Sequence, residues 1–248
     1  MNSIVTYEAA RDLLRPYIKE STSHDAPQVI ATWAQSLDGF ISREPGLPTV
    51  ISCPESLCLT HTLRSMCDGI LLGVSTIAAD DPSLNVRLQI PGQEFTNPRP
   101  IILDSKLRCP ENAKVLARSP IICTTRNHAP EKKTYLESLG ATVLILDAGF
   151  DRVDVARLLP ILKSQFGIQK VMVEGGASVL QEFIRLRLTD VCIVTIAPRL
   201  LGMGLHITHN VDRQDFGITT LEFKSSAFHT FGRDSVLIGY PTEGPHLL

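Results

Sequence analysis

The sequence predicts an α/β protein with a mixed, mostly parallel central sheet. Between residues 28 and 197, short apolar strands alternate with helices of about ten to fifteen residues, the order that produces a parallel sheet covered on both faces. The last two predicted strands, 219–230 and 235–240, are joined by a turn at 232–234 without a helix, which predicts a C-terminal antiparallel hairpin. A chain of 248 residues with 44% hydrophobic content can bury a full core in one domain.

The composition argues against several classes of protein. A net charge of -2 gives no overall field to hold nucleic acid or an anionic membrane, so we expect neither partner. Six cysteines without a C-x-x-C pair indicate reduced, packed thiols and not a disulfide framework or a zinc site. His206 and His209 lie in a glycine-containing connection and make a poor metal site, so we expect no metal. Without an apolar run for a membrane span or a signal peptide, we expect a cytoplasmic protein.

The N-terminal region is predicted to stand apart from the main domain. Apolar residues at helical spacing predict an amphipathic helix over 6–20, with a late kink at Pro16, and a polar linker follows it. We therefore expect a helical extension and linker over 1–27 and a single domain over 28–248.

The first strand and the first helix of that domain each end in candidate site residues. The strand over 28–35 runs into the turn SLDG, which places Ser36 and Asp38 at its carboxyl end. A helix is predicted over 52–67, with Ser52 as its cap and Arg64 near its end. A cation at a helix C-terminus is often merely solvated, so Arg64 alone does not indicate a site.

The stretch DGILLGVSTIAADDPSLNVR, residues 68–87, has the densest set of candidate ligand-binding groups. Its apolar run predicts a buried strand ending at Gly73, where backbone can approach a ligand closely. Ser75 and Thr76 are candidate caps for a short helical turn, whose free N–H groups suit an anion. Two carboxylates and a guanidinium complete the stretch: Asp80, Asp81 and Arg87. These groups predict a small-molecule site, although a capped turn with solvated charges fits the same residues.

The middle of the chain continues the alternation. Strands are predicted over 101–103, which ends at Ser105, and over 121–123, which ends in Thr124, Thr125 and Arg126. The sequence then predicts a helix over 130–139, a strand over 142–146 and a helix over 154–166 that Pro160 interrupts.

The segment KVMVEGGAS, residues 170–178, predicts a strand, a double-glycine turn and the start of a helix through about residue 188. Bare backbone N–H groups at such a turn and helix start form a cradle for an anion. A tight packing turn without a ligand would explain Gly175 and Gly176 equally well. Glu174 favours the ligand site, because an acid at the end of an apolar strand is costly without a partner.

Taken together in their order and spacing, six blocks of sequence resemble one family, the riboflavin-pathway pyrimidine reductases. The blocks are SLDG (36–39), LR (63–64), ILLGVSTIAADDPSLNVR (70–87), ILDS (102–105), VMVEGGAS (171–178) and APRLLG (197–202). The resemblance covers roughly residues 29–240 and implies a dihydrofolate-reductase-like three-layer fold and a homodimer. The zinc deaminase motifs H-x-E and P-C-x-x-C, which occur in fused bacterial relatives, do not occur here. The chain therefore looks like the stand-alone fungal and archaeal type.

The resemblance implies an NADPH-dependent oxidoreductase that reduces 2,5-diamino-6-(5-phospho-D-ribosylamino)pyrimidin-4(3H)-one to its ribitylamino counterpart. Hydride would pass to C1′ of the ring-opened sugar imine. The residues implied for NADPH are Thr76, Asp80, Ser105, Gly175, Gly176, Ala177 and Ser178. Those implied for the substrate are Ser36, Arg64, Leu84, Arg87 and Glu174, with Asp38 as a further candidate. Without an obvious His or Lys acid, Glu174, Asp80 or a bound water would supply the proton.

Three points stay open at the level of sequence. Thr124, Thr125 and Arg126 could hold the adenosine 2′-phosphate of NADPH, since they combine two hydroxyls and a cation at a strand end. A related NADPH reductase could instead act on the deaminated pyrimidine or on a pterin-like substrate. A non-catalytic nucleotide-binding module would keep the EGGAS cradle but oxidise no cofactor.

Overall fold

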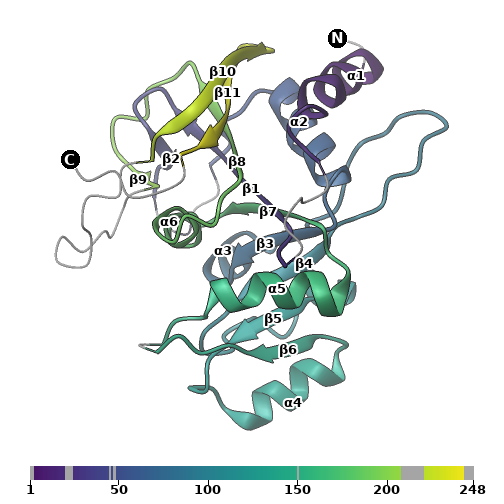
Figure 1. Ribbon diagram of the computed structural model, residues 1–248, viewed down its shortest axis with the longest axis vertical. Coiled ribbons are helices and arrows are strands. Elements are labelled where there is room, and N and C mark those ends of the chain that lie inside the picture. The colour runs from purple at the N-terminus through teal and green to yellow at the C-terminus, as the bar shows by residue number, and fades with distance from the viewer. Residues whose placement is uncertain are drawn as a thin grey trace.

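A nine-stranded sheet forms the centre of the molecule in the computed structural model, which describes residues 3–19, 25–44, 46, 49–149, 151–207 and 221–242 (Figure 1). In spatial order, the strands are β10 (Phe223–Phe231), β11 (Asp234–Pro241), β8 (Val191–Ala197), β1 (Gln28–Ser36), β7 (Lys170–Gly175), β3 (Gly69–Gly73), β4 (Arg99–Leu103), β5 (Ile121–Thr124) and β6 (Thr142–Ile145). The seven strands from β8 to β6 run parallel, whereas β11 pairs antiparallel with both β8 and β10. The predicted mixed sheet and C-terminal hairpin are therefore confirmed.

Helices cover both faces of the sheet. They are α1 (Ser3–Leu14), α2 (Pro54–Ser65), α3 (Val74–Asp80), α4 (Pro130–Ser138), α5 (Val155–Phe166), α6 (Ala177–Arg185) and the short 3-10 helix η1 (Lys114–Arg118). Successive strand residues point to opposite faces, so Ile30 packs into one core with α1 to α4 and η1, while Val29 and Ala31 pack into another with α5 and α6. The three layers expected from the resemblance are thus present.

Several boundaries differ from those predicted. The N-terminal helix ends at Leu14, two residues before Pro16, because the residue preceding a proline is driven away from helical backbone. Helix α2 starts at Pro54 with Cys53 as its N-cap and without a side-chain cap, so the assignment of Ser52 is wrong. Helix α6 ends at Arg185 instead of near residue 188.

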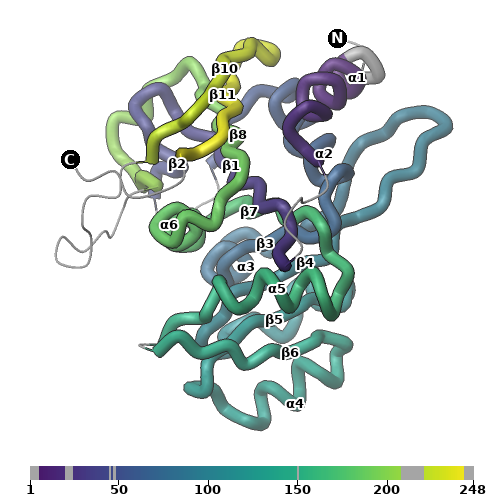
Figure 2. The backbone as a smooth tube through the Cα atoms, viewed as in Figure 1, coloured from purple at the N-terminus to yellow at the C-terminus, as the bar shows by residue number. Residues whose placement is uncertain are grey.

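Two short strands and a 3-10 helix were not predicted. Strands β2 (Phe40–Ser42) and β9 (Leu205–His206) form a separate two-stranded sheet, and η1 was missed. A long connection, residues 81–98, projects from the body between α3 and β4 (Figure 2). His209, the first two residues of the predicted strand at 219–230, and residues 21–24 of the linker lie outside the described residues.

The N-terminal helix joins the main core. Ala10 and Leu14 of α1 are fully buried and belong to the same core as Leu59 and Leu63 of α2. The division between residues 1–27 and 28–248 stays a prediction. None of the helices in the described part of the chain has the length and apolar character needed to cross a bilayer.

Candidate functional site

Three parallel strands end side by side at one edge of the sheet, and most of the predicted site residues lie there. Leu72 of β3 is opposite Gly175 of β7, and Gly73 is opposite Leu103 of β4. The start of α3, the double-glycine turn and Ser105 therefore meet at this edge. Ligand sites of open α/β sheets form outside the carboxyl ends of their strands.

The centre of the site is an ion pair between Arg64 and Glu174. The Arg64 guanidinium donates to both carboxylate oxygens, with Nη2 2.5 Å from Oε1 and Nε 3.1 Å from Oε2. Its Nη1 donates to the Asn85 carbonyl at 3.1 Å. The two charged side chains are only 12% and 18% exposed, so each needs the other to offset its lost hydration. The acid at the end of β7 therefore has a partner within the protein, so its position does not by itself indicate a ligand site.

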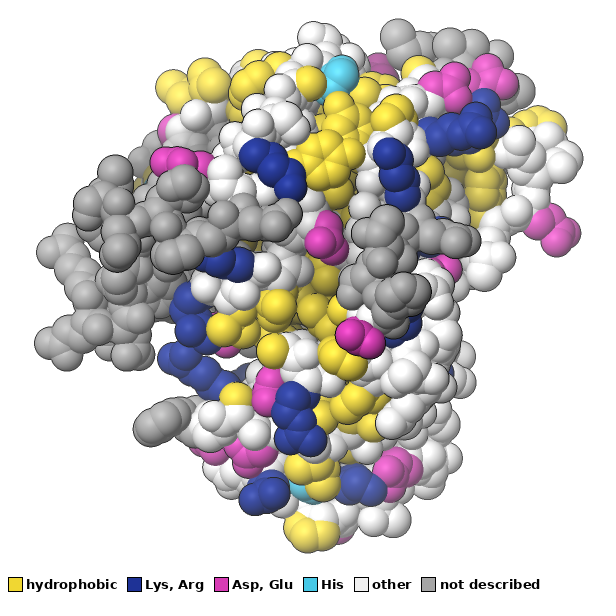
Figure 3. All heavy atoms as spheres, viewed as in Figure 1, with side chains coloured by type: hydrophobic (Ala, Val, Ile, Leu, Met, Phe, Trp, Pro, Cys, Tyr) yellow, Lys and Arg dark blue, Asp and Glu magenta, His cyan; other side chains and the backbone are white. Residues whose placement is uncertain are grey.

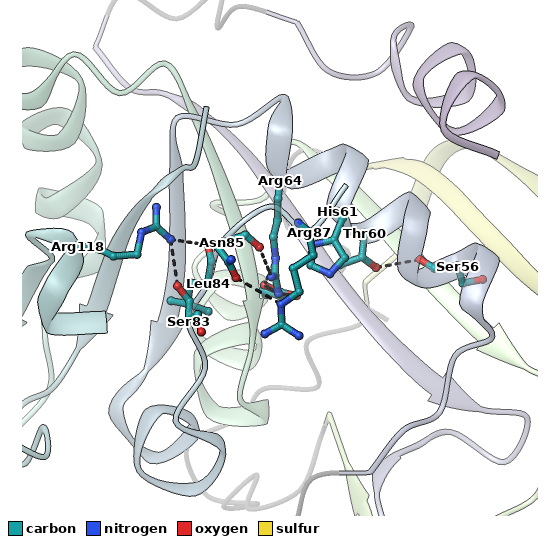
Figure 4. A network of polar contacts seen from close by, with 10 residues as sticks. Ser56, Thr60, His61, Arg64, Ser83, Leu84, Asn85, Arg87 and Arg118 are labelled. Carbon is teal, nitrogen blue, oxygen red and sulfur yellow. Dashed lines mark hydrogen bonds and ion pairs between the residues drawn. The ribbon is translucent and has the colours of Figure 1, made fainter. Parts of the chain in front are cut away.

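His61 belongs to the same cluster, although the sequence analysis did not select it. It precedes Arg64 by three residues on α2, so both side chains lie on one face of the helix (Figure 4). Its Nδ1 accepts the backbone N–H of Arg87 at 3.3 Å. Burial, and then the charges of Arg64 and Arg87, lower the His61 pKa from 6.5 to about 4. The imidazole is therefore neutral at pH 7, with its proton on Nε2. The H-x-x-R spacing was the signal that could have identified it.

The segment between α3 and β4 has an unusual backbone conformation. Asp81 and Leu84 both have positive φ angles, +40° and +52°. For residues other than glycine, this left-handed region costs roughly 1–2 kcal/mol each. The Leu84 side chain is nevertheless 1% exposed and part of the core, which offsets that cost. Leu84 thus fixes the path of the loop that carries Asn85 and Arg87, while the Arg87 side chain itself is exposed.

The double-glycine turn fits a phosphate group held by backbone. Gly175 and Gly176 have φ angles of +141° and +55°, and α6 begins at Ala177. A Cβ atom at Gly176 would lie 3.1 Å from the hydroxyl oxygen of Thr76. The Thr76 hydroxyl therefore lies beside bare backbone at a helix N-terminus, an arrangement that suits an anion. Helix α3 begins at Val74 with Gly73 as its N-cap, so Ser75 and Thr76 lie in its first turn and are not caps.

A cavity of about 310 Å³ lies next to this turn, between the end of β4, residues 151–155 at the start of α5, and α6. Ser105 and Ser178, both predicted cofactor residues, line it. The sequence analysis missed its charged lining residues, which are Asp151, Arg152, Glu182 and Arg185. Figure 3 shows basic side chains gathered beside α6 on this flank of the molecule. Arg185 is paired with Glu182, with 2.6 Å between Nη2 and Oε1, so the lining carries charges of both signs.

The surroundings of Thr124, Thr125 and Arg126 restrict which of them can reach a ligand. Thr124 and Thr125 are fully buried, and the Thr125 hydroxyl donates to the Ser105 carbonyl at 2.8 Å. Only Arg126 of that group is exposed, and its backbone N–H donates to Asp147. The 2′-phosphate prediction at this strand end therefore rests on the Arg126 guanidinium.

The predicted pair Ser36 and Asp38 connects two loops. Ser36 is buried and donates to Asp38 Oδ1 at 2.5 Å, while Asp38 also accepts the backbone N–H groups of Leu201 and Gly202. The Ser36 hydroxyl, followed by these N–H groups, lowers the Asp38 pKa to about 2. This carboxylate joins the turn after β1 to the connection after β8.

Comparisons with known proteins agree with this geometry. The family described as the RibD C-terminal domain matches residues 27–237. The 2,5-diamino-6-ribosylamino-4(3H)-pyrimidinone 5′-phosphate reductase of Debaryomyces hansenii is 37% identical over 206 residues, 76% of this chain and 83% of the relative. The riboflavin biosynthesis protein RibD of Aquifex aeolicus is 36% identical over 220 residues, 88% of this chain but 57% of the relative.

A solved structure gives the same result. The Saccharomyces cerevisiae riboflavin biosynthesis reductase Rib7 has a TM-score of 0.73 and 28% identity, with 93% of this chain and 98% of that chain covered. Both the sequence match and the fold match extend over most of the chain. The chain therefore belongs to the RibD C-terminal domain family of riboflavin-biosynthesis reductases.

Proposed function

We propose that this oxidoreductase reduces 2,5-diamino-6-(5-phospho-D-ribosylamino)pyrimidin-4(3H)-one to the 5-phospho-D-ribitylamino product, with NADPH as the reductant, in riboflavin biosynthesis. One observation carries the proposal. The double-glycine turn separates a cavity on the α5 and α6 side of the sheet from the cluster of Arg64, Glu174, His61 and Arg87 on the α2 side. A dinucleotide on one side can thus meet a phosphorylated substrate on the other.

The cofactor side is formed by residues that would bind phosphate and would take no part in the reaction itself. Gly175 to Ser178 and Thr76 would hold the pyrophosphate, because their backbone and hydroxyl groups are bare at the start of α6. Ser105 would contact the cofactor from β4. The exposed Arg126 would supply the positive charge that favours NADPH over NADH. When bound, the nicotinamide supplies the hydride for C1′ of the substrate.

The substrate side has two arginines with different tasks. Arg64 donates three hydrogen bonds to Glu174 and one to the Asn85 carbonyl. Its main role is therefore to orient the Glu174 carboxylate. Arg87 is exposed and would take the 5′-phosphate of the substrate with its planar guanidinium. The neutral His61 would offer its Nε2–H as a further donor.

Asp80 is the better of the two predicted proton donors. Glu174 accepts hydrogen bonds from a guanidinium on both oxygens, which is the arrangement of an ionised carboxylate. Asp80 lies at the end of α3, and partial desolvation of its carboxyl raises its pKa. This shift favours the protonated form that a general acid needs, although the Asp80 side chain is exposed.

Turnover by the purified protein tests this function. We expect anaerobic incubation with NADPH and the diaminopyrimidine substrate to consume NADPH, followed by its absorbance, and to yield the ribitylamino product by mass spectrometry. The deaminated pyrimidine should be run in parallel, because the fungal reductase and the bacterial RibD are almost equally similar to this chain. Faster reduction of the deaminated compound would contradict the proposed substrate, and no turnover of either would contradict the proposed activity.

A further inference from the structure

We propose that Arg118 of η1 is a positioning residue for the substrate side of this reductase. Its guanidinium holds the backbone of residues 83–85 in the conformation that presents Arg87. The inference rests on the proposed function for the identity of the substrate, and on the geometry of the loop for everything else.

The Arg118 guanidinium is committed to backbone carbonyl groups. Its Nη1 donates to the carbonyl oxygens of Ser83 at 3.1 Å and Leu84 at 2.8 Å, and its Nη2 donates to that of Pro98 at 2.8 Å. No carboxylate among the described residues pairs with it. It therefore joins the two ends of the projecting connection, 83–84 at its start and 98 at its end.

Arg64 holds the same loop from the opposite side. Figure 4 shows residues 83 to 85 between the two guanidinium groups, with Arg118 on one side and Arg64 on the other. Arg64 donates to the carbonyl of Asn85, next to the Leu84 carbonyl that Arg118 binds. The strained Leu84 is thus fixed from both sides, and strained backbone that is held in this way is typical of functional sites.

The rest of η1 supports the same segment. The Lys114 backbone N–H donates to Asp81 Oδ1 at 2.9 Å, and the Lys114 ammonium is 3.1 Å from Oδ2. Asp81 and Leu84 are the two residues other than glycine with positive φ in this loop, and η1 contacts both. The Lys114 contact is exposed and therefore weaker, which leaves Arg118 as the main constraint.

Two variants and a matched control test the inference. Arg118→Met removes the donors but keeps much of the volume, and Arg118→Lys keeps the charge without the planar fork. Arg99→Met is the control, because the partly buried Arg99 donates at 2.8 Å to the Ser119 carbonyl just after η1 without contacting residues 83–85. It disturbs the same element and leaves the proposed clamp intact.

We expect Arg118→Met to raise KM for the phosphorylated substrate about tenfold or more, because a misplaced Arg87 loses its charge-assisted hydrogen bond to the phosphate. Its Kd for NADPH should stay within about twofold of the wild-type value, and Arg118→Lys should be intermediate. Arg99→Met should leave KM unchanged. A third variant, Arg118→Ala, leaves space for a free guanidinium ion. Millimolar guanidinium should partly reverse the rise in its KM. An unchanged KM in Arg118→Met, or an equal rise in Arg99→Met, would overturn the inference.

Hydrogen exchange separates this inference from the proposed function. Backbone amides of residues 83–88 should exchange faster in Arg118→Met and Arg118→Lys than in the wild type and in Arg99→Met. This result does not depend on turnover, whereas the proposed function fails if the wild type reduces no substrate. Unchanged exchange in this loop would overturn the role of Arg118 even in an active enzyme. If Arg118→Met does not fold, the Arg118→Lys variant gives the same comparison.

Discussion

At the residue scale, Arg64 and Arg87 differ in what surrounds them. Arg64 is 12% exposed and bound to Glu174 and Asn85, whereas Arg87 is exposed and has a single side-chain contact, to the Asn85 amide oxygen at 3.3 Å. A side chain held by protein groups mainly orients its neighbours, while one with unused donors is available to a ligand. The two arginines should therefore respond differently to substitution.

Arg87→Ala should lower kcat/KM for the phosphorylated substrate by about 1.5–3 kcal/mol, the range for a charge-assisted hydrogen bond. Arg87→Lys should also be harmful, since an ammonium cannot form the paired bonds of a guanidinium. Thermal stability should hardly change, because the side chain is exposed. Arg64→Ala should reduce stability as well, because it leaves Glu174 largely buried without its partner.

The dephosphorylated substrate is the control for this prediction. Wild-type enzyme should lose much of its activity on the nucleoside, and Arg87→Ala should show little preference between the two forms. A full preference for the phosphorylated form in Arg87→Ala would exclude Arg87 as the phosphate ligand.

His61 predicts an effect of pH on stability. The unfolded chain protonates this ring near pH 6.5 and the folded chain near pH 4, so the unfolded state binds more protons between these values. The stability that depends on the neutral ring is complete above about pH 6.5 and is lost as the pH falls towards 4. One pKa unit corresponds to about 1.4 kcal/mol, and partial exposure reduces the effect, so we expect a loss of roughly 1–2 kcal/mol. Denaturant unfolding across this range should show a shallower decline for His61→Gln; equal slopes would contradict the shift.

At the element scale, the turn between β7 and α6 predicts how the cofactor binds. Gly176→Val adds a branched side chain at a φ of +55°, with its Cβ 3.1 Å from the Thr76 hydroxyl oxygen. We expect NADPH affinity to fall at least tenfold, because the new side chain fills the space between the backbone and the pyrophosphate, with roughly 1–2 kcal/mol of stability lost to strain. Calorimetric titration and thermal unfolding would measure the two effects. Full loss of folding would instead favour a packing role for this turn.

The elements that were predicted correctly are those whose signal is local. Strands β1 and β3 to β8 are apolar runs bounded by turn residues, and α5 is bounded by Asp154 and Gly167, its N-cap and C-cap. The missed elements depend on distant partners: Phe40 of β2 pairs with His206 of β9, and η1 is a single short turn held against the 81–84 loop. No pattern in a five-residue segment such as KVLAR indicates such a contact.

The site was predictable in part for the same reason. Motif order selected Glu174 and Arg64 separately, but the argument that an unpaired acid favours a ligand site did not foresee that these two residues pair with each other. His61 was missed because its contact is the backbone of Arg87, 26 positions away; the H-x-x-R spacing places it beside Arg64 but does not show that contact. The burial of Thr124 and Thr125 was equally hidden, since a hydroxyl after a strand can point into the protein or into a ligand site.

At the scale of the whole molecule, the sheet links the two sides of the site. Each central strand sends alternate residues into the α2 core and the α5–α6 core, so the proposed substrate and cofactor sides share one rigid support. At one end of the sheet β10 is the edge strand, none of the described elements pairs with its outer side, and Phe228 on it is 68% exposed. An exposed edge of nine residues is a site for association with another chain.

We therefore expect a homodimer that buries the surface of the C-terminal hairpin. A symmetric pair of molecules would cover Phe228 and the outer edge of β10 with the same surface of the second copy. Light scattering at micromolar concentration should give twice the mass of one chain, and Phe228→Glu should shift the protein towards the monomer because it places a charge in the contact. Tyr135→Glu is the matched control, since Tyr135 is an exposed aromatic on α4 at the opposite end of the sheet (Figure 1). A monomeric wild type would contradict the dimer, and equal dissociation by both variants would show that the contact lies elsewhere.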